Sequence, residues 1–198
     1  MSIITSEELK TFLGIADTVD EPTIISATAA ANEWVEAYCG RTFAAPAAAT
    51  AKTFRPTDQR TLSVPDFSTA AGLIVKTDDD DDGTYETTWT VTTDFIVEGV
   101  DGRPYDQLVA VGSRLFPVWN RHRSVQVTAV WGWTAVPGAV QHATRIQAAR
   151  LFKRKDSPAG VLGGFADFTA LRVSSRIDPD VADMLQPFRH PDIAVHVA

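Results

Sequence analysis

Hydrophobic and polar positions repeat with two different periods along the chain. Near the start, and again after about residue 136, apolar residues recur every three or four positions, as on one face of a helix. Between about residues 61 and 133, apolar and polar residues instead alternate, as in strands with one buried face. The change of period predicts a helical body made by both ends of the chain, with a β part inserted between them.

Two helices are predicted before the β part. The first begins at Thr5, which forms a capping box with Glu8, and ends at Gly14. The second has Asp20 as its N-cap, Pro22 in its first turn and Gly40 at its end. Its apolar stripe at helical spacing comprises Ile24, Ile25, Thr28, Ala31, Trp34, Val35 and Tyr38. Residues 44–51 are rich in alanine and contain a proline, which predicts a connector.

The β part is predicted to be antiparallel, because short alternating runs are separated by turn signals. Strands are expected at 61–64 and 72–77, followed by a turn at 78–83. Alternation over 89–97 predicts one long strand, and Asp101-Gly102 marks the next turn.

The stretch 124–154 joins the β part to a helix. One face of its strand carries only apolar side chains, from Val125, Val127, Ala129, Trp131 and Trp133. Gly132 leaves the opposite face bare, so another backbone can approach there. Pro137 fits a helix start, and the helix is expected to run to about Lys155, with small residues such as Ala143 and Ala148 facing other helices.

A last helix is expected to begin at Asp178-Pro179, and the tail after Pro191 is apolar with no following element to cover it. The apolar side of this helix packs either on its own subunit or on a partner. For the tail we favour docking on a neighbour, through strand addition, over simple disorder. The residues predicted to bind a partner are Val181, Leu185, Phe188, Ile193, Val195 and Val197.

These patterns predict an α+β fold. The helical body is expected to comprise residues 1–45 and 136–190, the antiparallel β insertion residues 46–135, and an extended C-terminal tail residues 191–198.

Composition narrows the possible functions. The net charge of −7 argues against a general phosphate-neutralising surface. The single cysteine, Cys39, excludes an internal disulfide and a cysteine-based metal cluster. No apolar run approaches the length that spans a bilayer, so no membrane partner is expected. Because the first residues lack a basic region followed by an apolar core, we expect no signal peptide and synthesis in a cytoplasm.

Five consecutive aspartates at 78–82 are the most conspicuous charged feature. They could hold a cation, but the alternating ligands of an EF-hand are missing, and a solvated hairpin tip without metal is the favoured interpretation. No close ligand pair is formed by the four histidines, His122, His142, His190 and His196. The sequence GVLGG at 160–164 is neither a Walker motif nor GxGxxG, and GxSxG is absent. We therefore expect no catalytic, cofactor-binding or metal site.

Several sequence pieces, in this order and spacing, resemble the head-tail connector (adaptor) proteins of long-tailed phages, which sit in a ring under the portal. The pieces are TSEELKTFLGI, VEAYCGRTF, LSVPDFSTAAGLIVKTDDDDDGTYE, VTAVWGWTAVP, AARLFKRKDSPAG and DPDVADMLQPF. They span most of the chain.

The resemblance implies a structural virion protein of the neck and no enzymatic activity. It implies a twelve-fold ring, with portal protein above, a stopper or tail protein below, and DNA passing through the lumen. The segment after Asp178 would dock on the portal. Two alternatives stay open: another neck or tail-completion protein, for which less helix is expected at both ends, and a small enzyme or ligand-binding domain, which would need a pocket with convergent polar groups.

Overall fold

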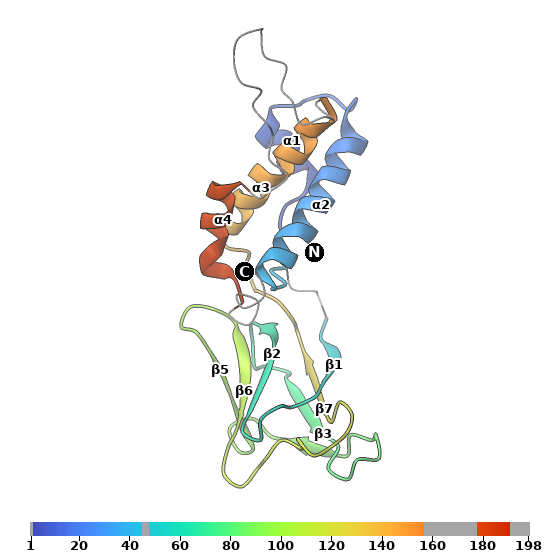
Figure 1. Cartoon of the computed structure of the whole chain (residues 1–198), viewed down its shortest axis with the longest axis vertical. Coiled ribbons are helices and arrows are strands. Elements are labelled where there is room, and N and C mark those ends of the chain that lie inside the picture. The colour runs from blue at the N-terminus through green and yellow to red at the C-terminus, as the bar shows by residue number, and fades with distance from the viewer. Residues whose placement is uncertain (1, 45–47, 157–177, 191–198) are drawn as a thin grey trace. The chain divides into compact units, whose positions relative to one another are not determined.

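The computed structural model describes residues 2–44, 48–156 and 178–190. The chain forms two compact units (Figure 1). The β unit is Thr42–Ala135, and the helical unit combines Ser2–Arg41 with the described residues from Val136 onward. Helices from both sides of the insertion and two antiparallel sheets confirm the predicted α+β fold class.

The helical unit contains four α-helices in its described residues. They are α1 (Ser6–Leu13), α2 (Glu21–Cys39), α3 (Gly138–Lys153) and α4 (Pro179–Leu185), with single 3₁₀ turns at Arg154–Asp156 and Gln186–Phe188. The capping box is confirmed, because the Glu8 amide donates to the Thr5 hydroxyl at 3.2 Å and the Thr5 amide donates to the Glu8 carboxylate at 2.7 Å. Gly14 and Gly40 end α1 and α2 in the left-handed conformation, as predicted.

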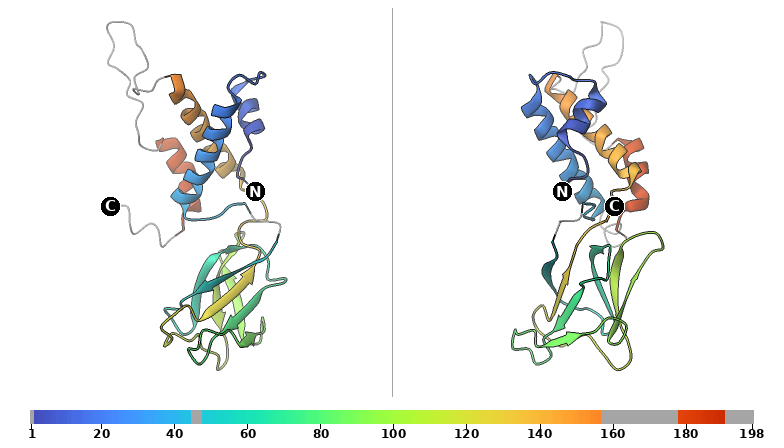
Figure 2. Two further views of the ribbon diagram at one scale, coloured as in Figure 1. Left: turned by 90° about the vertical axis from the view of Figure 1, so that its right-hand side faces the viewer. Right: turned by 180° about the vertical axis from the view of Figure 1, so that it is seen from behind.

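Helix α3 packs against each of the other three helices (Figure 2). Ala143 and Ala148 are fully buried on α3, and their small side chains let α2 approach closely. Ile25 was expected in the apolar stripe of α2 but is 52% exposed, because its neighbour Ile24 takes the inward position. Consecutive residues on a helix point about 100° apart, so both cannot face the core fully.

In the described part of the chain, ion pairs join α3 and the 3₁₀ turn that follows it to the surrounding helices. Arg145 lies 3.5 Å from Glu8 of α1, and Arg150 lies 2.5 Å from Asp178 at the start of α4. After α3 ends, Lys155 lies 2.5 Å from Asp20, the N-cap of α2. All six side chains are partly exposed, so each pair contributes about 1 kcal/mol or less. Apolar packing therefore carries most of the stability of this unit, and the ion pairs fix which helix ends meet.

The β unit is built from two antiparallel sheets. The four-stranded sheet has the order β1-β7-β3-β4 and the three-stranded sheet the order β2-β6-β5. The strands are β1 (Thr50–Phe54), β2 (Thr61–Phe67), β3 (Ile74–Thr77), β4 (Thr87–Trp89), β5 (Phe95–Gly99), β6 (Tyr105–Ala110) and β7 (Val125–Ala129).

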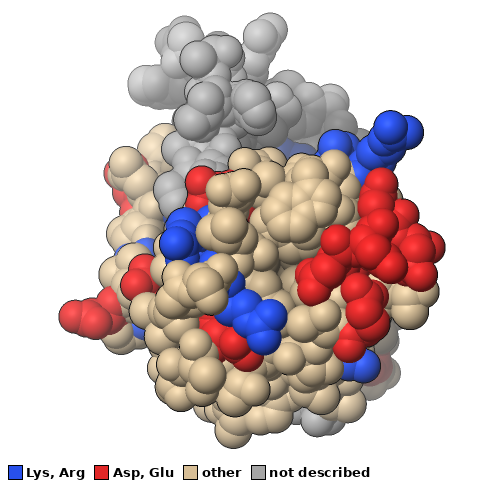
Figure 3. Space-filling view, turned by 90° about the horizontal axis from the view of Figure 1, so that it is seen from below, with Lys and Arg blue, Asp and Glu red and all other residues tan. Residues whose placement is uncertain are grey.

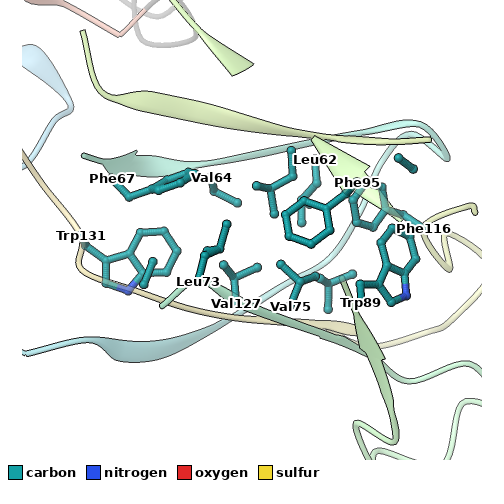
Figure 4. Close-up of a cluster of buried hydrophobic side chains, with 14 residues drawn as sticks. Leu62, Val64, Phe67, Leu73, Val75, Trp89, Phe95, Phe116, Val127 and Trp131 are labelled. Atoms are coloured by element: carbon teal, nitrogen blue, oxygen red, sulfur yellow. The ribbon is translucent and has the colours of Figure 1, made fainter. Parts of the chain in front are cut away.

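The core of the β unit lies between the two sheets (Figure 4). All five apolar residues predicted to share one face at 125–133 are buried, which confirms that part of the pattern. Trp131 contacts Phe67 edge-on and donates its ring N–H to the Thr50 carbonyl at 2.9 Å. Gly132 has φ 105° and donates its amide to the Asp66 carbonyl, so a second backbone approaches where the sequence predicted.

Two predictions about the β unit are wrong. The single strand expected over 89–97 is divided, because β4 ends at Trp89 and β5 begins at Phe95 in the other sheet. Thr92 turns the chain at φ 69°, and the Asp94 carboxylate accepts the Thr90 amide at 2.8 Å. The segment 44–51, expected as a connector, overlaps the start of β1, a strand that was not predicted and that pairs with β7 from Thr50↔Ala129 to Phe54↔Val125.

Candidate functional site

The acidic segment 78–82 follows β3 and is held in a defined loop. The side chain of Asp78 is fully buried, and its carboxylate accepts the amides of Asp81 at 2.9 Å and Gly83 at 2.8 Å. The other four aspartates are exposed, as expected for a hairpin tip. The expectation of exposure is wrong for Asp78, because its carboxylate closes the loop from inside.

His122 connects this loop to a distant segment. Its Nε2 lies 2.7 Å from an Asp78 carboxylate oxygen and its Nδ1 lies 2.9 Å from one of Asp81. Both ring nitrogens of His122 therefore lie within hydrogen-bond distance of a carboxylate of the loop. The Asn120 side-chain amide also donates to the Asp78 carbonyl at 2.7 Å, and the Arg121 amide to Asp81 at 3.1 Å. Segment 120–122 and the acidic loop therefore form one connected surface.

Two carboxylates in this loop have pKa values that are shifted in opposite directions. Burial acts to raise the pKa of Asp78, but hydrogen bonds from the Gly83 amide and His122 outweigh it and lower that pKa. Partial desolvation and the nearby charges of Asp82 and Glu86 raise the pKa of Asp80. The exposed side of the loop thus carries mutual repulsion, which the hydrogen bond from the Asp82 amide to Asp80 at 3.3 Å does not fully offset.

Carboxylate oxygens of Asp78, Asp80, Asp82 and Glu86 all lie within 4.8 Å of one another. Acidic side chains gather in one patch in the space-filling view (Figure 3). Sequence spacing did not predict this grouping, because Glu86 approaches only when the chain turns back into β4. Asp78 already accepts hydrogen bonds from three groups, and the absence of a metal site stays a prediction.

We expect the Asp78→Asn variant to have a lower Tm than the wild type at pH 7, since the amide replaces an acceptor that serves three donors. The lowered pKa of Asp78 means that its stabilisation is present above its unfolded-state pKa and is lost as pH falls through its folded-state pKa. The gap between variant and wild type should therefore shrink on acidification. Thermal unfolding followed by circular dichroism at pH 7 and at lower pH values measures this.

Asp80→Asn is the matched control. The raised pKa of Asp80 means that its ionised form is disfavoured in the folded state, so the variant should be at least as stable as wild type at pH 7. Equal destabilisation by both substitutions would contradict the assigned roles of the two carboxylates.

The outer edge of β1 is a second candidate surface. Among the described strands, β1 pairs with β7 and occupies the edge of its sheet. A shallow groove of about 630 Å³ runs along this edge. Its lining residues are Ala51, Lys52, Thr53, Phe54, Arg55 and Arg123. The three cationic side chains are exposed, and the Lys52 ammonium lies 4.8 Å from the centre of the Trp131 ring. Sequence analysis missed this groove because it did not predict β1.

The residues predicted to bind a partner have different surroundings. Val181 and Leu185 are fully buried, and α4 packs on α3 in the same chain. These two side chains therefore pack within their own subunit, which is the first of the two interpretations offered for this helix. Phe188 is half-buried. Ile193, Val195 and Val197 lie outside the described residues, so their role stays a prediction.

Elsewhere in the described residues, cysteine, histidine and serine residues that were considered as catalytic candidates make structural contacts. Burial raises the pKa of the Cys39 thiol to about 12, which keeps it protonated and unreactive near neutral pH. The ring of His142 lies edge-on to Phe12, and the His190 amide donates to the Cys39 carbonyl at 2.8 Å. The buried Ser124 hydroxyl donates to the Pro117 carbonyl at 2.9 Å. His196 and the GVLGG sequence lie outside the described residues.

No helix within the described residues has the length and apolar character needed to cross a membrane.

The chain is similar in fold to chains of gene transfer agent (GTA) particles. A chain in the neck of an empty GTA particle, computed with C6 symmetry, is 14% identical with a TM-score of 0.59, over 94% of this chain and 89% of that one. A chain in the neck of a native GTA particle, computed with C12 symmetry, is 16% identical with a TM-score of 0.57, over 92% and 86%. A chain from the virion of a native GTA particle is 17% identical with a TM-score of 0.55, over 94% and 89%.

No known family model matches the sequence, and a comparison with curated proteins finds no relative. At these identities, the similarity to the GTA chains is one of fold. It extends over both the helical and the β unit.

Proposed function

We propose that this protein is a structural component of a phage-like neck, the head-to-tail adaptor that forms a ring beneath the portal and joins it to the stopper or tail. The observation that carries the proposal is the fold similarity to a GTA neck chain over 94% of this chain and 89% of the other. Because both units are covered, the shared architecture includes the β insertion as well as the helices.

The proposed ring is twelve-fold. One of the similar neck chains belongs to a particle computed with C12 symmetry, and the other to one computed with C6 symmetry. The net charge of −7 supports a lumen through which DNA passes without being held, since like charges repel. The partners proposed are the portal protein, further copies of this chain, and the stopper or a tail protein. The location proposed is the neck of the virion.

The helical unit carries surfaces suited to such partners. Three large apolar side chains are exposed on it, namely Phe12 at 45%, Val19 at 84% and Ile25 at 52%. A shallow groove of about 350 Å³ beside α1 is lined by Phe12, Thr11, Glu7, Glu8 and Arg145. An exposed aromatic ring rimmed by charged groups is the composition expected where a partner docks.

A tail-completion protein is the alternative within the same class. Less helix is expected at both ends of such a protein. Here α1 and α2 precede the β unit and α3 and α4 follow it, and together they form a unit of their own. This observation favours the adaptor.

A non-enzymatic role is part of the proposal. It is supported by the GTA neck chains and by the engagement of Cys39, Ser124 and His122 in structural contacts.

Immunogold electron microscopy of purified particles tests the location. Antibody against the protein is expected to label the junction between head and tail. Label at the distal end of the tail, or over the capsid shell, would contradict the proposed function.

A further inference from the structure

The two edges of the four-stranded sheet carry opposite charges. Strand pairing puts Phe54 beside Val125, Val125 beside Thr77, and Thr77 beside Thr87, so these residues form one row across the sheet. Arg55 follows this row at the β1 edge, and Glu86 precedes it at the β4 edge. The basic groove and the acidic loop therefore lie at the same end of the sheet but at opposite edges.

The charges at the two edges are available for pairing. Lys52, Arg55 and Arg123 are exposed along the β1 groove. Asp80, Asp82 and Glu86 are exposed at the other edge and crowd one another, and a cation placed beside them would reduce their repulsion. Within one chain, β7 and β3 separate β1 from β4, so Arg55 and Glu86 lie at opposite edges of the sheet. Arg123 precedes β7 and lies between these edges, where its carbonyl accepts the Tyr85 hydroxyl at 2.7 Å.

Strand direction also permits the sheet to continue between copies. Each neighbouring pair in the order β1-β7-β3-β4 is antiparallel, so β4 runs opposite to β1. A β4 edge placed beside the β1 edge of a second copy would thus make another antiparallel neighbour. An unpaired strand edge is a ready template for such pairing.

We propose that the β1 groove of one copy receives the acidic loop and the β4 edge of a second copy, with Arg55 of the first facing Glu86 of the second. The two surfaces differ, so the contact is head-to-tail, and repeated contacts of this kind close into a ring when the rotation permits. This inference rests on the proposed function for its ring, and it identifies the surfaces through which the copies meet.

The small contribution of each exposed ion pair predicts weak binding between two free copies. Exposed ion pairs each add little to affinity, and salt screens them. Two free copies should therefore associate weakly, and a ring gains stability when a portal holds many copies in place.

Disulfide trapping tests the contact in the full-length protein. Arg55→Cys and Glu86→Cys are made in separate chains, which are mixed at high concentration and oxidised. The native Cys39 is fully buried and does not compete. We expect a covalent dimer from the mixture, and a ladder of higher oligomers from a chain carrying both substitutions, because the contact is head-to-tail. Glu33→Cys, an exposed position on α2, mixed with Arg55→Cys is the matched control and should stay monomeric.

Charge variants give a second readout. Arg123→Glu in the Arg55→Cys chain, or Asp82→Asn in the Glu86→Cys chain, should reduce trapping towards the control level. Raising NaCl from about 0.05 M to about 0.5 M should do the same, since the Debye length shortens severalfold. Trapping no greater than the control under all conditions would overturn the inference.

Three further outcomes are distinguishable. The first outcome is that trapping stays at the control level, while Ca²⁺ binds the wild-type loop stoichiometrically at micromolar concentration and does not bind the Asp80→Asn variant. In that case the loop is a cation site and the inference is wrong. If trapping fails while immunogold labels the neck, the inference fails and the proposed function stands. If trapping succeeds while the label lies elsewhere, the contact between copies stands and the neck function fails.

Discussion

Replacing Trp131 by alanine is expected to lower the free energy of unfolding of the β unit by about 3–5 kcal/mol, the usual cost of removing a large buried ring. Trp131 is 2% exposed and lies between the rings of Phe67 and Phe54. The substitution also removes the N–H that donates to the Thr50 carbonyl, so the edge strand β1 loses an anchor. Urea unfolding followed by far-ultraviolet circular dichroism measures the change.

Trp119→Ala is the matched control for this variant. The side chain of Trp119 is 57% exposed, so its removal should change the free energy of unfolding by about 0.5 kcal/mol or less. Similar unfolding midpoints for the two variants would contradict the position of Trp131 in the core.

Deleting residues 191–198 is expected to abolish binding to the portal while leaving the fold intact. The shortened chain retains α4, with Val181 and Leu185 buried against the helical unit, so the helical core is preserved. Circular dichroism checks the fold, and co-sedimentation with the portal checks binding. The apolar pattern Ile193, Val195 and Val197 is the reason for the expected loss, since alternate apolar residues suit strand addition to a partner.

A full-length variant with serine at Ile193, Val195 and Val197 separates the side chains from the length of the tail. It should bind as poorly as the truncated chain. If the truncated chain still assembles on the portal, the role assigned to the tail is wrong.

Features fixed by local chemistry could be predicted from the sequence. The capping box needs only Thr5 and Glu8, and the end of α2 needs only a glycine that accepts a left-handed conformation. The buried face of β7 follows from strict alternation over 125–133. These signals were sufficient for the α+β fold class.

Features that depend on distant residues were missed. Strand β1 forms because β7 offers it a partner at Thr50↔Ala129, and its own short sequence, TAKTF, shows no alternation of apolar and polar residues. Asp78 is buried because His122, 44 residues away, and the amides of its own loop surround it. Alternation at 89–97 continues through a turn that Thr92 makes at φ 69°, so the pattern alone could not show the break. The groove and the acidic patch are products of this long-range folding.

The central claim is that the protein forms a ring beneath the portal. Electron microscopy of the purified protein mixed with the portal of its own particle tests this claim most directly. We expect a ring of twelve copies stacked coaxially on one end of the portal, with both units resolved in each copy. A portal that stays bare at saturating protein concentration, or single copies bound without ring symmetry, would contradict the proposed function.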